Sequence, residues 1–278
     1  MEPGRPPEPK ECLRLWRPSG PPRGQLVAVH GIGGHGGQFA QLAERLVPRD
    51  WAVWAPDLPG HGHCPGRRGV VPSWEFLGDT VASILAQAAA ATPAAPLLLL
   101  GHSLGGAVCV DLLLRRPALA ARLRGLVLTN PALDGDGVAR WRVLVAQLLA
   151  EVWPGFTLST GIDMAASSRD PDAVERFRQD PLRHGRCSAR LGAGFLNAAA
   201  RVTRRAAELR LPLLVLQSGD DRVTAPAAAE RFFRNTGSAD KTWRLYPRSR
   251  HELFDDLDRE EALADLLGWL EIRAGDGG

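Results

Sequence analysis

The sequence contains only four cysteines, and their positions do not form a recognisable cysteine-based site. Cys12, Cys64, Cys109 and Cys187 are scattered, no Cys-x-x-C pair occurs, and we expect no metal site among them. Cys109 lies in an apolar segment and is typical of a small buried residue. Nothing in this pattern requires an oxidising compartment.

The chain also lacks long apolar runs and a strong charge of one sign. No run of about eighteen apolar residues occurs, although a membrane-spanning helix requires one. Residues 1–10, MEPGRPPEPK, are proline-rich and polar, so we expect a loose tail and no secretory signal. The formal net charge of +3 is too small to indicate a nucleic-acid partner. We expect a soluble cytoplasmic protein, with peripheral contact to membranes as the open alternative.

Apolar strands alternate with helical segments along most of the chain, which indicates an α/β fold with a mostly parallel sheet. Its 278 residues are enough for one large domain. Strands are expected at 12–16, 26–30, 51–56, 97–100, 126–129, 213–217 and 241–246. Helices are expected at 38–46, from Ser73 to about 91, after residue 103, at 225–235 and at 260–270.

The alternation stops between about residues 132 and 208. This segment contains an apolar helical stretch at 143–153 and a more polar region at 161–190. Because it follows the middle strands, we expect it to lie over the carboxyl ends of the strands, where α/β sheets bind ligands. The sequence therefore predicts a helical cap over a binding site.

Ser103 is placed where a short apolar run turns into a helical segment, in the sequence Gly101-His102-Ser103-Leu104-Gly105. Gly-x-Ser-x-Gly in this setting is the nucleophile elbow. A tight, strained turn is needed to present the serine hydroxyl, and side chains at positions 101 and 105 would collide with backbone. The following helix directs free N–H groups at the serine. Ser103 is therefore the candidate nucleophile.

A serine nucleophile needs a base and an acid that orients it. In α/β-hydrolases these partners follow the serine in the order acid, then histidine. His251 follows the last predicted strand and is the candidate base. The acid is Asp220 or Asp221, which follow the strand before it.

Other polar residues near strand ends are weaker candidates. Asp134 is a second possible acid, whereas Asp57 is interpreted as a structural loop residue. His184 lies in the predicted cap and is expected to be exposed. His61 and His63 could indicate a metal, but no carboxylate or cysteine completes a site, so we expect no metal.

Negative charge on the substrate oxygen requires two N–H donors. The residue after the nucleophile, Leu104, supplies one, and the glycine-rich loop after an earlier strand supplies the other. In that loop Ile32 is the candidate, and His30 is expected to brace the loop. No cofactor is implied.

The chain resembles the monoacylglycerol lipase and lysophospholipase family of serine α/β-hydrolases over nearly its whole length. The motifs that carry the resemblance are His30-Gly31-x-Gly33-x-His35, Asp57-x-x-Gly60-His61-Gly62, Gly66-x-Arg68-Gly69, Asp79, Gly101-His102-Ser103-Leu104-Gly105-Gly106, Gly161-Ile162-Asp163, Ser168-Arg169, Asp180-Pro181-Leu182 and Leu196-Asn197-Ala198. In this family the acid precedes an arginine, which selects Asp221 before Arg222. The family often has Glu and Arg where this chain has Gly34 and Gln38, which puts polar contacts to the glycerol end in question.

The resemblance implies an α/β-hydrolase domain over residues 11–278 with a catalytic triad of Ser103, Asp221 and His251. It implies hydrolysis of monoacylglycerols to a fatty acid and glycerol through an acyl-enzyme. Lysophospholipase or short-chain carboxylesterase activity is the alternative, and Arg140, Arg142, Arg183 and Arg186 are available for a charged head group. The helical stretch at 143–153 either meets a lipid interface or only packs on the domain. Polar substitutions at Leu148 and Leu149 distinguish these two roles.

Overall fold

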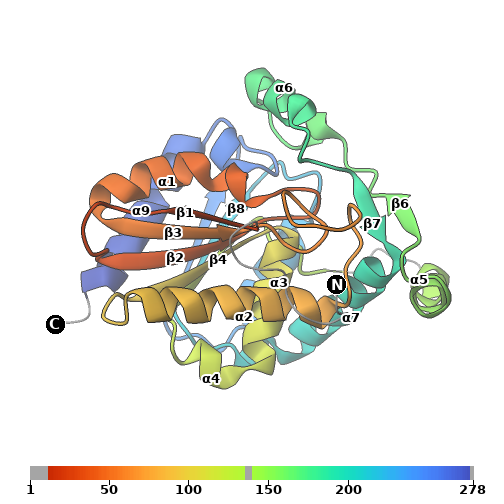
Figure 1. Cartoon of the computed structure of the whole chain (residues 1–278), viewed down its shortest axis with the longest axis horizontal. Coiled ribbons are helices and arrows are strands. Elements are labelled where there is room, and N and C mark those ends of the chain that lie inside the picture. Colours follow the sequence, from red (N-terminus) through yellow and green to blue (C-terminus); the bar gives the residue numbers. More distant parts are fainter. Residues whose placement is uncertain (1–11, 135–139, 276–278) are drawn as a thin grey trace.

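A seven-stranded sheet forms the centre of the computed structural model, which describes residues 12–134 and 140–275 (Figure 1). The strand order is β1-β3-β2-β4-β5-β8-β9, and every neighbouring pair is parallel except β1 with β3. The strands are β1 (Leu13–Trp16), β2 (Gly24–Val29), β3 (Trp51–Pro56), β4 (Leu97–His102), β5 (Gly125–Thr129), β8 (Leu213–Ser218) and β9 (Lys241–Tyr246). The predicted α/β class with a mostly parallel sheet is confirmed.

Helices cover both faces of the sheet, because the five inner strands are buried along their whole length. Figure 1 shows α1 and α9 on one face and α2 and α3 on the other. Each face has its own apolar core, one containing Phe39 and Leu266 and the other containing Leu77 and Val108. These helices are α1 (Ala40–Leu46), α2 (Trp74–Ala91), α3 (Leu104–Arg115), α4 (Pro117–Ala120), α8 (Pro226–Asn235) and α9 (Arg259–Gly275).

Most element boundaries agree with the sequence expectation to within a few residues. The Ser73 hydroxyl accepts a hydrogen bond from the Phe76 N–H at 3.1 Å, so the predicted N-cap of α2 is confirmed. The helix expected at 38–46 begins with a 3₁₀ turn, Gly36–Phe39, and α9 continues beyond residue 270. Across the described ranges, none of the helices is long and apolar enough to cross a membrane.

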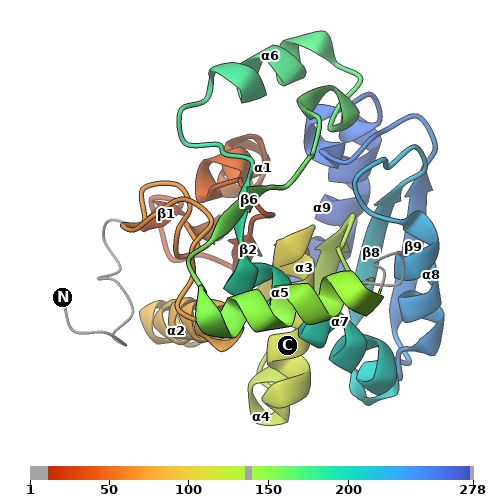
Figure 2. The same ribbon diagram turned by 90° about the vertical axis from the view of Figure 1, so that its right-hand side faces the viewer.

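The connection from β5 to β8 contains α5 (Arg140–Val152), β6 (Thr157–Ser159), α6 (Pro171–Gln179), β7 (Arg186–Ser188) and α7 (Ala189–Arg205). Figure 1 shows α5 and α6 standing away from the central sheet, and Figure 2 shows β6 between them. The antiparallel pairing of β6 with β7 was not predicted. The His184 N–H donates to the Gly33 carbonyl at 3.0 Å, so the connection contacts the loop after β2. Its expected limits as a cap, 132–208, stay a prediction, and the expected tail at 1–10 lies outside the described residues.

Two of the cysteines are brought together, which the sequence spacing did not indicate. Cys12 and Cys64 form a disulfide across 52 positions of sequence. Because β1 pairs antiparallel with β3, the Asp57 N–H donates to the Cys12 carbonyl at 2.7 Å, and the loop after β3 returns beside the start of β1. Cys109 is buried, as expected.

Candidate active site

Ser103 occupies the turn between β4 and α3 in a strained backbone conformation. Its φ angle is 53° and its ψ angle is −122°, which a residue with a side chain rarely adopts. A Cβ atom on Gly105 would lie 2.3 Å from the Val29 carbonyl oxygen, and one on Gly101 would lie 2.7 Å from the Gly106 Cα. The expected reason for both glycines is therefore confirmed, since only glycine fits these close approaches.

Asp221 and His251 are brought into direct contact from the loops after β8 and β9. His251 Nδ1 lies 2.9 Å from Asp221 Oδ2. The Asp221 carboxylate also accepts hydrogen bonds from the Val223 N–H at 2.8 Å and from the Thr224 hydroxyl at 2.7 Å. Burial alone would raise the pKa of Asp221, but the hydrogen bond with His251 and the other donors hold it below its usual value. An ionised Asp221 fixes the proton of His251 on Nδ1 and leaves Nε2 as the proton acceptor.

Ser103 and His251 face the same small cavity of about 30 Å³. Gln38, Thr160 and Arg183 also line this cavity. Within the described ranges, no hydrogen bond joins the Ser103 hydroxyl to His251. Such bonds are often long before a substrate is bound. The structure thus joins Asp221 directly to His251, and Ser103 and His251 line the same cavity.

The other candidate acids have different partners. Asp220 pairs with Arg169 at 2.6 Å, and this contact, with two further arginines, lowers the pKa of Asp220 to about 2. The buried Asp57 carboxylate accepts backbone hydrogen bonds from Gly36 and His63, so its structural role is confirmed. Asp134 forms an ion pair with Arg231 at 3.2 Å. Of the four aspartates considered, Asp221 is the one hydrogen-bonded to His251.

The two candidate oxyanion donors lie beside Ser103. Leu104 begins α3, and Ile32 lies in the loop after β2; both residues line a large cavity with Ser103. Neither backbone N–H donates to a carbonyl within the described residues. His30 braces this loop as expected, since Nε2 accepts from the Leu58 N–H at 2.9 Å and Nδ1 donates to the Gly31 carbonyl at 2.7 Å. Burial lowers the pKa of His30 to about 3, which keeps it neutral.

The expectation that His184 is exposed was wrong. Its Nε2 lies 3.2 Å from the Gly60 carbonyl oxygen, and its ring centroid lies 4.7 Å from that of His61. Burial lowers the pKa of both histidines, so they are neutral packing groups at neutral pH. Taken over the described residues, no three His, Cys, Asp or Glu side chains are grouped so as to hold a metal ion.

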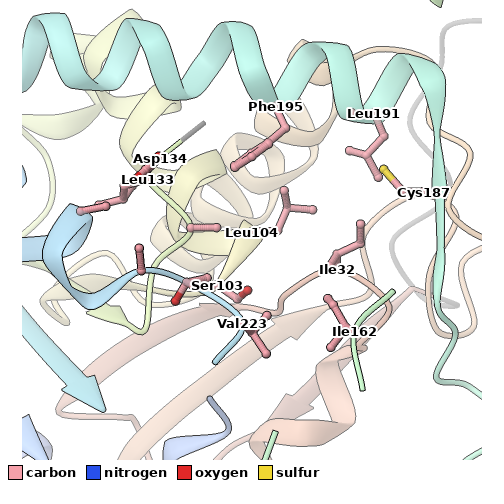
Figure 3. Close-up of a pocket in the computed structure, with 15 residues that line it drawn as sticks. Ile32, Ser103, Leu104, Leu133, Asp134, Ile162, Cys187, Leu191, Phe195 and Val223 are labelled. Carbon is pink, nitrogen blue, oxygen red and sulfur yellow. The ribbon is translucent and has the colours of Figure 1, made fainter. Parts of the chain in front are cut away.

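A cavity of about 570 Å³ extends from Ser103 beneath α7. Figure 3 shows Leu191 and Phe195 projecting from α7 into this space, on the side opposite Ser103. Leu133, Ile162 and Val223 are among the other apolar residues that line it. The volume is in the range of small-molecule sites, and the apolar lining suits a hydrocarbon chain. Sequence reasoning missed this lining, although residues 191 and 195 have the i, i+4 spacing of one helix face.

Known proteins resemble this chain over most of its length. The family described as serine aminopeptidase, S33, matches residues 20–258. Monoglyceride lipase from Mus musculus is 34% identical over 268 residues, covering 94% of this chain and 86% of the mouse protein. Monoacylglycerol lipase from Mycolicibacterium smegmatis is 30% identical, with 92% and 91% covered. The crystal structure of Paleococcus ferrophilus monoacylglycerol lipase has a TM-score of 0.85 and 33% identity, covering 94% of this chain and 99% of that one.

The sheet order, the elbow at Ser103 and the loops after β8 and β9 define an α/β-hydrolase. The chain belongs to the monoacylglycerol lipase family of serine α/β-hydrolases, which are carboxylic ester hydrolases. The resemblance that the sequence motifs indicate is confirmed.

Proposed function

We propose that the protein hydrolyses monoacylglycerols to a fatty acid and glycerol through an acyl-enzyme on Ser103. The observation that carries this proposal is that Ser103 lines two cavities of opposite character. The large one is apolar and suits one acyl chain, whereas the small one is lined by polar side chains such as Gln38 and Thr160. At about 30 Å³ the small cavity has room for about two water molecules, so it takes one end of a small polar alcohol; an ester of one long chain with a small polyol matches this division.

The proposed reaction assigns each step to a named group. The Ser103 hydroxyl attacks the ester carbonyl carbon while His251 Nε2 takes the proton, and Asp221 stabilises the imidazolium. The N–H groups of Ile32 and Leu104 bind the oxyanion, and losing one such donor typically costs about 3 kcal/mol of transition-state stabilisation. His251 then protonates the glycerol oxygen as its bond to the carbonyl carbon breaks. Water, deprotonated by His251, releases the fatty acid and regenerates Ser103.

Residues 132–208 are proposed to act as a cap that meets lipid. Several apolar side chains on α5, β6 and the turn between them are exposed: Leu144, Val145, Leu148, Val152, Trp153 and Leu158. Leu149, in contrast, is half-buried. The helix therefore packs with one face and leaves an apolar face free for a membrane or micelle.

A charged head group is less well supported. Arg183 lines the small cavity, but its guanidinium forms an ion pair with Glu252 at 3.0 Å. Arg186 is exposed, and the side chains of Arg140 and Arg142 lie outside the described residues. Because Glu252 neutralises Arg183, the cavity offers no free positive charge from it to a phosphodiester. This favours glycerol over a lysophospholipid head group.

Hydrolysis rates on matched esters test the proposal. The panel contains a monoacylglycerol, a lysophosphatidylcholine, a triacylglycerol and a short nitrophenyl ester, with Ser103→Ala as the control. We expect the highest kcat/KM on the monoacylglycerol and loss of all activity in the Ser103→Ala protein. A preference for lysophosphatidylcholine or for the short ester would reject the proposed substrate.

A further inference from the structure

A buried ion pair joins the proposed cap to the loop that carries His251. Arg183, in the loop between α6 and β7, places Nη1 3.0 Å from Glu252 Oε1. The two side chains are only 9% and 12% exposed. The guanidinium also lies 4.0 Å from the ring centroid of Phe177 on α6. The cap thus contacts the residue immediately after His251 through a charged, desolvated pair.

The second oxygen of Glu252 faces the nucleophile elbow. Glu252 Oε2 lies 3.4 Å from Nε2 of His102, the residue before Ser103. His102 Nδ1 lies 3.1 Å from the Thr129 hydroxyl oxygen. Nδ1 also lies 3.2 Å from the Thr129 carbonyl oxygen, so Thr129 and Glu252 contact opposite edges of the His102 ring. Its centroid is 4.9 Å from that of His251, so Glu252 touches the surroundings of both the nucleophile and the base.

Glu252 carries a fixed negative charge in this site. Burial would raise its pKa, but Arg183, His102 and His251 together lower it to about 2. Burial lowers the pKa of His102 to about 4, so that ring is neutral near pH 7. Two carboxylates therefore act on His251: Asp221, which is hydrogen-bonded to Nδ1, and Glu252, which interacts electrostatically with the ring and is paired with Arg183.

Two further charged groups lie beyond Glu252. Burial is the main cause that raises the pKa of Asp255 to about 6, and the negative charge of Glu252 is the second. Arg176 of α6 pairs with Asp255 at 3.2 Å. Asp255 and Arg176 form their own pair, and within the described residues Arg183 is the guanidinium that pairs with Glu252.

We propose that Arg183 and Glu252 are positioning residues that couple the seated cap to the alignment and charge balance of His251. This inference rests on the proposed function of His251 as the base. With Arg183 in place, the Glu252 charge is compensated and Asp221 is the carboxylate that acts on the imidazole. When the cap withdraws Arg183, the uncompensated Glu252 carboxylate stabilises the protonated, inactive imidazole. The base is thus fully competent only under a closed cap.

Variants at the two positions are predicted to change the pH dependence in opposite directions. The measurement is kcat/KM against pH on a short nitrophenyl ester, which does not require a lipid interface. The acid limb is the part of the profile in which kcat/KM falls as the pH is lowered. Arg183→Met should move this limb to higher pH by about one unit, and Glu252→Gln should move it to lower pH. The double variant and Arg183→Lys should both return the limb close to the wild-type position. The loss of activity in the two single variants should appear in kcat, on the order of tenfold, rather than in KM.

Arg259→Met is the matched control. Arg259 forms another ion pair between the core and the proposed cap, with Asp170 at 2.9 Å, and it should leave the acid limb unchanged. If Arg183→Met does not fold, Glu252→Gln and the double variant still give the comparison. Shifts in the same direction, or a double variant that does not restore the limb, would overturn the coupling. Wild-type protein without Ser103-dependent turnover would instead reject the proposed function.

Discussion

The exposed apolar face of α5 permits a quantitative prediction for lipid binding. Leu144 and Leu148 are 65% and 64% exposed and lie four residues apart on one helix face. Burying a leucine side chain completely contributes about 1.5–3 kcal/mol, so burying the exposed part contributes about 1–2 kcal/mol for each residue. The double variant Leu144→Gln/Leu148→Gln should then weaken partition onto lipid by about 2–4 kcal/mol, which is roughly 30- to 900-fold.

Two assays separate lipid contact from chemistry. Co-sedimentation with phosphatidylcholine vesicles measures partition, and turnover of a short nitrophenyl ester measures the active site alone. The double variant should lose vesicle binding and the rate on vesicle-bound monoacylglycerol while retaining the nitrophenyl ester rate. Ile272→Gln is the control, because Ile272 is 62% exposed on α9, away from the proposed cap. Equal losses on both substrates, or an equal effect of Ile272→Gln, would refute the interface and leave α5 a packing element.

Three further substitutions test the site and its surroundings. Asp221→Asn should reduce kcat by roughly 10³- to 10⁴-fold with an unchanged circular dichroism spectrum, because the ring of His251 loses its orienting carboxylate. Gly105→Ala should destabilise the fold by at least about 2 kcal/mol in denaturant unfolding, because its Cβ would lie 2.3 Å from the Val29 carbonyl oxygen. Asp255 has a pKa raised to about 6, so its contribution to stability is present at low pH and is lost as the pH rises through about 6. Asp255→Asn should therefore reduce the fall in Tm as the pH rises through about 6. An unchanged slope of Tm against pH would contradict the raised pKa.

Local signals predicted much of the framework. The strands at 51–56 and 241–246 have the expected ends, because turn residues bound their apolar patterns. The N-cap of α2 was predictable because Ser73 directly precedes the apolar pattern of the helix, and serine is a preferred N-cap residue. Chain order alone also indicated that an aspartate after β8 and the histidine after β9 meet, and Asp221 and His251 do so.

Features that depend on distant parts of the chain were not predictable in this way. The Cys12–Cys64 disulfide follows from the antiparallel pairing of β1 with β3, and cysteine spacing carries no sign of that pairing. His184 is half-buried because its loop folds back onto the Gly60 turn. The contact of Arg183 with Glu252 joins positions 69 residues apart, and no local pattern links them.

Direct detection of the acyl-enzyme would show whether Ser103 carries the acyl group of a monoacylglycerol. The protein is mixed with 1-oleoylglycerol, and the reaction is quenched with acid during turnover. The protein is then digested, and the mass of the peptide that contains Ser103 is measured by mass spectrometry. We expect an added oleoyl group on Ser103 that is absent in Ser103→Ala and much reduced when His251 is replaced by alanine, because His251 is also the base of the acylation step. Continued release of oleate by the Ser103→Ala protein, or turnover with the acyl group on another residue, would contradict this expectation.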